Sequence, residues 1–124
     1  ISNIFIMANK RNLKKAIKIT CGNLAGECIM ARNFVPDIDT KKMEEIIFNI
    51  ADLQFVTIDN VTFSFDKNES AFENRHLYNK ARKDYFRKGY HKLIADFNKG
   101  VADIVDQMNA ALPEKQKEAN KAAK

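Results

Sequence analysis

The sequence predicts an all-α fold, an up-down-up three-helix bundle with a long third helix. Three observations predict it: apolar residues recur at helical spacing in three stretches, capping residues precede two of them, and short connections join them. Short connections make neighbouring helices antiparallel. The 124 residues, 45% hydrophobic and 30% charged, suffice for one domain with its own core.

The first helix is expected between Asn9 and Asn33. Residues three or four positions apart form its apolar face: Leu13, Ile17, Cys21, Leu24, Cys28 and Ala31. Gly22 and Gly26 share a second face, where the missing side chains predict the close approach of another helix. The helix is expected to end before Pro36, because proline disfavours the helical conformation of the preceding residue.

Asp39 is the expected N-cap of the second helix, with Ile38 and Met43 placed to form a hydrophobic staple across it. The apolar stripe of this helix is formed by Met43, Ile46, Ile50 and Leu53. Residues 55–65 are rich in β-branched and aromatic side chains, which is also typical of a hairpin. A continuing helix is favoured over that alternative, because an isolated hairpin is marginal and no other strand is expected.

The third helix is expected over residues 70–112, opened by a capping box of Ser70 and Glu73. Its apolar face continues through Tyr90, Leu93, Phe97, Val101, Ile104 and Met108. At 1.5 Å per residue this helix would be roughly 60 Å long, against roughly 37 Å for the first. It therefore either projects past its partners or bends, and Gly89 and Gly100 are the expected bend sites.

The domain organisation is simple. Residues 9–112 are expected to form the bundle, residues 1–8 an N-terminal extension, and residues 113–124 a polar, disordered tail. Met7 is a candidate natural start, which would make residues 1–6 an addition. The sequence shows neither a signal peptide nor an apolar run long enough for a membrane span, so a cytoplasmic protein is expected.

Two segments carry a resemblance to known proteins. Residues 7–28 combine a basic stretch, a Leu-Lys-Lys and two cysteines seven residues apart, with glutamate before the second cysteine; residues 94–108 read Ile-Ala-Asp-Phe-Asn-Lys-Gly-Val-Ala-Asp-Ile-Val-Asp-Gln-Met. In both segments the chain resembles a group of small, uncharacterised bacterial proteins. The resemblance implies an all-helical cytoplasmic protein, with helix at 55–65. It implies no activity.

Charge is segregated along the chain. Residues 1–33 and 74–92 are strongly basic, whereas residues 34–73 carry nine acidic and three basic side chains. This order indicates either attraction between neighbouring elements or an external polyanion. One basic cluster lies at the start of the expected first helix: Lys10, Arg11, Lys14, Lys15 and Lys18.

The other basic cluster supplies the candidate phosphate-binding residues. They share or flank one face of the third helix: Arg75, Lys80, Lys83, Arg87 and His91. Aromatic residues interleave them and would stack on unpaired bases if exposed, or else belong to the core: Tyr78, Tyr85, Phe86 and Tyr90.

Other candidate sites have less support. Cys21 and Cys28 lie about 10.5 Å apart along a helix, too far to form a disulfide or to bind one zinc ion, so they are expected to fill the core. Glu73 and His76 have the spacing of a di-iron motif, but the chain lacks the second motif. Phosphate-loop and hydrolase motifs are absent from the sequence, which predicts no catalytic residue, metal or cofactor.

The expected function is therefore that of a non-catalytic interaction module that binds a protein partner. A homodimer is favoured, because the first two helices are apolar on more sides than three helices bury. The alternative is a nucleic-acid-binding module that uses the basic stripe of the third helix. The alternative requires Lys80, Lys83 and Arg87 to be exposed and unpaired, whereas a packing role has them facing acidic residues of the second helix.

Overall fold

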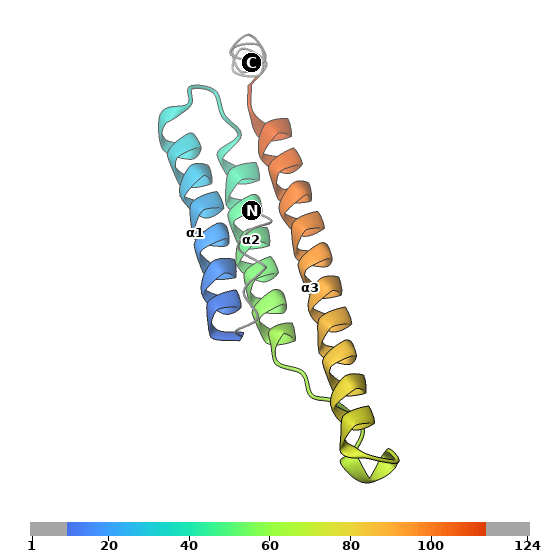
Figure 1. Cartoon of the computed structure of the whole chain (residues 1–124). Coiled ribbons are helices and arrows are strands. Elements are labelled where there is room, and N and C mark those ends of the chain that lie inside the picture. The colour runs from blue at the N-terminus through green and yellow to red at the C-terminus, as the bar shows by residue number, and fades with distance from the viewer. Residues whose placement is uncertain (1–9, 114–124) are drawn as a thin grey trace.

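The computed structural model describes residues 10–113, which form three α-helices and one short 3₁₀ turn, with no strand among them. The helices are α1 (Lys10–Phe34), α2 (Thr40–Val61) and α3 (Arg75–Ala111), and the 3₁₀ turn η2 spans Glu69–Ala71. In Figure 1 the chain follows α1, returns along α2 and runs back along α3. The all-α class is confirmed, while the expected extension at 1–8 and the tail after Pro113 lie outside the described residues.

The connection between α1 and α2 follows the expected turn and cap. Asp37, next to Pro36, has a φ of 61°, a left-handed conformation that aspartate tolerates better than most residues. Asp39 is the N-cap, and its side chain accepts a hydrogen bond of 3.1 Å from the backbone N–H of Lys42. Arg32 and Glu44, 4.0 Å apart, form an ion pair across the two helices.

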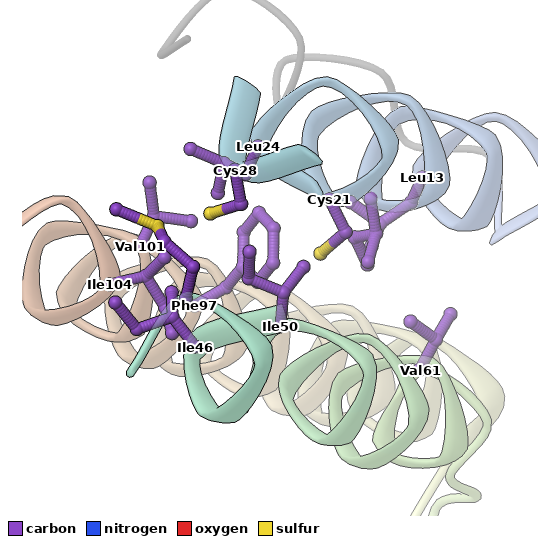
Figure 2. Close-up of a cluster of buried hydrophobic side chains, with 12 residues drawn as sticks. Leu13, Cys21, Leu24, Cys28, Ile46, Ile50, Val61, Phe97, Val101 and Ile104 are labelled. Atoms are coloured by element: carbon purple, nitrogen blue, oxygen red, sulfur yellow. The ribbon is translucent and has the colours of Figure 1, made fainter. Parts of the chain in front are cut away.

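All three helices contribute to one core (Figure 2), where Phe97 reaches from α3 into the space between α1 and α2. The buried members are Leu13, Ile17, Cys21, Leu24, Cys28, Met43, Ile46, Ile50, Val61, Phe97, Val101 and Ile104. Most of them belong to the stripes expected from the sequence, so helical periodicity located the core correctly.

The stretch 55–65 is helical only in its first part. α2 continues to Val61, and an extended segment follows from Thr62. In that segment Phe63 and Phe65, two residues apart, both pack on rings of α3. The alternation that suggested a hairpin therefore reflects an extended segment that lies on a helix, without a second strand.

The third helix begins later than expected. Its N-cap is Asn74, whose side-chain oxygen accepts a hydrogen bond of 2.9 Å from the N–H of Leu77. Ser70 lies in the 3₁₀ turn and Glu73 lies outside the helix, so the expected capping box is wrong. Extended backbone at Phe72 instead brings that ring against Phe65 and Tyr78.

From Arg75 the helix is continuous for 37 residues and extends beyond the ends of α1 and α2 (Figure 1). The two glycines expected to bend α3 lie instead where neighbouring side chains come very close. A Cβ added to Gly89 would lie 2.6 Å from the Phe63 ring, and one added to Gly100 would lie 2.6 Å from Leu53. At Gly22 and Gly26, where close approach was expected, no atom of residues 10–113 outside the adjacent backbone lies within 4 Å of an added Cβ.

Candidate functional site

The projecting half of α3 and the segment that precedes it form a distinct substructure, which we call the arm (residues 62–92). Seven rings hold it together: Phe63, Phe65, Phe72, Tyr78, Tyr85, Phe86 and Tyr90. Phe63 is central, with ring centroids of Tyr90, Phe86 and Tyr85 at 4.9, 5.3 and 5.9 Å. Offset and edge-on contacts of this kind are favourable beyond the area they bury.

The rings are thus engaged with one another, and stacking on bases is not the role that the structure gives them. Burial of Tyr90 between Phe63 and Phe86 raises the pKa of its hydroxyl. The tyrosines of α3 pack in this aromatic cluster; Tyr85 stays 37% exposed, and Tyr90 also packs against the three-helix core. Of the two sequence-based interpretations of these rings, packing is the one that the structure supports.

The candidate cations lie mainly on the opposite side of α3 from these rings. Four of them are exposed: Lys80, Lys83, Arg87 and His91. Their spacing keeps them on one side of the helix. Arg75 is exposed as well, but it is the first residue of α3 and its position falls on another side. Four of the five candidates therefore form one stripe, and Arg75 does not.

Acidic residues of α2 do not neutralise this stripe. Within the described residues the one ion pair of these cations joins Arg87 to Asp84, one turn earlier on α3, at 3.1 Å and in an exposed position. Two acidic residues of α2 have other partners. Glu45 pairs with Lys42 of the same helix, and Glu44 pairs with Arg32 in the last turn of α1. The packing role considered for Lys80, Lys83 and Arg87 is not what the structure shows. All three side chains are exposed, as the nucleic-acid alternative requires, but Arg87 is paired with Asp84 and does not meet the requirement that these cations be unpaired.

One residue from each basic region of the sequence, Lys10 and Arg82, lies at the same ring, on the side of α3 away from the stripe. The Lys10 Nζ lies 5.9 Å from the Phe86 ring centroid, and the Arg82 Cζ lies 5.0 Å from the same centroid. The first turns of α1 also line a shallow hollow with five cations: Lys10, Arg11, Lys14, Lys15 and Lys18. We call Lys80, Lys83 and Arg87, together with Lys10 and Arg82 on the ring side of α3, the basic surface. Sequence spacing locates both groups of cations but not the meeting of Lys10 with Arg82 at Phe86.

The cysteines occupy the core, as expected. Cys21 and Cys28 are both free thiols and both buried on α1. Burial raises the pKa of each thiol, and the neighbouring Glu27 carboxylate raises that of Cys28 further. At neutral pH both are therefore present as the unreactive thiol rather than the thiolate.

We expect both cysteines to react at least about 100-fold more slowly with a thiol-specific reagent in the native protein than in guanidinium, because reaction must await local opening. The measurement is stopped-flow labelling at pH 7 with and without denaturant. Labelling of either native cysteine at the rate of glutathione would show an accessible, reactive thiol instead.

Metal-binding arrangements are not found in the described part of the chain, where no three His, Cys, Asp or Glu side chains converge. Because α3 starts at Arg75, Glu73 and His76 do not share a helix, and the di-iron spacing loses its structural basis. Over residues 10–113 no helix has the length and apolarity needed to cross a membrane.

No family model, curated protein or solved structure matches this chain at a significant level. The resemblance carried by residues 7–28 and 94–108 stays a prediction.

Proposed function

We propose that this up-down-up bundle is a non-catalytic interaction module whose basic surface binds the phosphate backbone of nucleic acid. The observation that carries the proposal is the exposed stripe of Lys80, Lys83 and Arg87 on α3, which no acidic residue of α2 neutralises among the described residues. Phosphates attract such an area through release of their counterions.

The geometry favours a duplex over a single strand. Single-strand binding relies on aromatic rings that stack on bases, and the arm's rings are packed against one another. The stripe from Lys80 to His91 extends about 16 Å along one helix, and a projecting helix has a diameter that suits a major groove about 12 Å wide. Binding through phosphates alone is independent of base sequence.

The test is titration of a labelled DNA duplex at about 50 and 200 mM salt. With about five phosphate contacts, we expect affinity to fall roughly 500-fold between these salt concentrations. Lys83→Glu with Arg87→Glu removes two contacts, so affinity should fall more than about tenfold at the lower salt and the salt effect should shrink to roughly 40-fold.

The matched control is Lys41→Glu with Lys99→Glu, which makes the same change in net charge at exposed sites outside the arm. It should weaken binding far less than the change on the stripe. Equal weakening by the two pairs, or binding that does not respond to salt, would contradict the proposal. Tighter binding of a single-stranded RNA than of the duplex would contradict the preference for a duplex.

A further inference from the structure

The α1–α2 hairpin exposes large apolar side chains next to the groove between its two helices. Phe48 and Phe55 are 73% and 72% exposed, and their spacing of seven residues puts both on one side of α2. Next to them lies a groove of about 490 Å³, and the described residues that line it belong to α1 and α2. We call this area the hairpin face: Gly22, Ala25, Phe48, Ala51, Phe55 and Ile58. Exposed apolar areas of this kind mark interaction sites.

Gly22 and Gly26 leave room on the α1 side of this face. Each glycine within a helix costs about 1 kcal/mol relative to alanine. Within the described chain, nothing approaches within 4 Å of a Cβ added at either position. The space is therefore available to a side chain from outside the hairpin.

The ion pair between Arg32 and Glu44 gives the register of the antiparallel hairpin. Counting ten residues along each helix from that pair places Gly22 at the height of Gln54, one residue from Phe55. The lining of the groove, which includes all three residues, agrees with this register. Counting fourteen residues places Lys18 at the height of Ile58, one residue from Asp59.

We infer that a second copy of this chain covers the hairpin face, related by a two-fold axis parallel to the helices. Such an axis lays α2 of one copy over α1 of the other, antiparallel and at equal height. Phe55 of each copy then fills the space above Gly22 of the other. The contact between Phe55 and Gly22 thus occurs twice, once for each copy, and the four helices form a bundle. This proposal is independent of the basic surface.

Charge favours a second copy over an unrelated apolar partner. Toward the end of the face near Phe55, the exposed charges are basic on α1, at Lys15 and Lys18, and acidic on α2, at Asp52 and Asp59; at its other end α2 carries the exposed Lys41. Among the described residues none of the four charges near Phe55 forms an ion pair within the chain. The two-fold arrangement brings Lys18 of each copy to Asp59 of the other, so the surface is complementary to itself.

The available area is that of a stable dimer. The hairpin is about 37 Å long and two helices, roughly 20 Å, wide. It therefore presents about 700 Å², close to the roughly 800 Å² that each partner contributes to a standard interface.

The first test is the mass of the full chain in solution, measured by light scattering on a sizing column at concentrations up to about 100 μM. We expect twice the 14.2 kDa of one chain. Phe48→Glu with Phe55→Glu should weaken the dimer more than about 100-fold, because it places four carboxylates in an apolar interface. The control is Ala102→Glu with Val105→Glu, which adds the same charges at exposed positions of α3 and should leave the dimer intact.

A charge exchange tests the register independently of the phenylalanines. Lys18→Asp or Asp59→Lys alone should weaken the dimer about tenfold, because each puts two like-charged pairs in contact. Both changes together should restore it. A monomer at the highest concentration, an unaffected dimer in the Phe48 and Phe55 variant, or failure of the double exchange to restore association would each overturn the inference.

Discussion

Replacing Phe97 with alanine is expected to lower the free energy of unfolding by about 3–5 kcal/mol. The ring is 1% exposed and lies between α1 and α2, so its removal leaves a cavity that three helices must close together. This is the largest effect that we expect from a single substitution. It is a large share of the total, because a domain of this size has only about 5–15 kcal/mol of stability. Urea denaturation followed by circular dichroism measures it.

Val105 provides the control on the same helix. Its side chain is 39% exposed, and Val105→Ala should change the free energy of unfolding by no more than about 0.5 kcal/mol. If Phe97→Ala costs as little as the control, Phe97 does not hold the three helices together.

Replacing Phe63 with alanine is expected to loosen the arm and leave the rest of the bundle folded. The ring contacts Tyr85, Phe86 and Tyr90 and lies against Gly89, so truncation removes the centre of the aromatic packing. We expect a local cost of about 2–3 kcal/mol. Trypsin cleavage within 62–92 should then become about 30- to 150-fold faster, because cleavage follows the population of the opened arm.

Phe34→Ala is the matched control, because that ring is exposed at the end of α1 and outside the arm. It should leave the cleavage rate within the arm unchanged. Cleavage of the Phe63 variant at the original rate, or loss of most of its helical signal, would show that the arm is not a separate unit.

Much of the fold follows from local patterns in the sequence. The apolar face of α1 is buried as its spacing predicts, because a helix repeats every 3.6 residues whatever packs against it. Its buried residues are Leu13, Ile17, Cys21, Leu24 and Cys28. Asp39 caps α2 because its side chain reaches a backbone N–H three residues away, which is again a local interaction. Predictions of this kind require no knowledge of tertiary structure.

The start of α3 could not be predicted in the same way. Ser70 and Asn74 are both good capping residues, and local sequence does not decide between them. The choice depends on Phe72, whose extended backbone brings its ring to Phe65 and Tyr78. Burying the Phe72 ring against Phe65 and Tyr78 favours the later start of α3. Phe65 lies outside the helix, so the sequence around Ser70 and Asn74 does not reveal this contact.

The candidate site was predictable only in part. Helical spacing identified the stripe that contains Lys80, Lys83 and Arg87, and these side chains are exposed in the structure. The meeting of Lys10 with Arg82 at Phe86 depends on how α1 packs beside α3, which helical spacing cannot reveal. The same limit explains why close approach was assigned to Gly22 and Gly26 instead of Gly89 and Gly100.

The overhang of α3 has a thermodynamic consequence. One continuous helix passes through two environments: residues near Phe97 open only when the three-helix core opens, whereas residues near Tyr78 need only the aromatic contacts of the arm to break. The chain thus has two free energies of opening, and the lower belongs to the arm. A ligand held there raises that lower value by mass action. Local opening near Tyr78 would therefore report such binding.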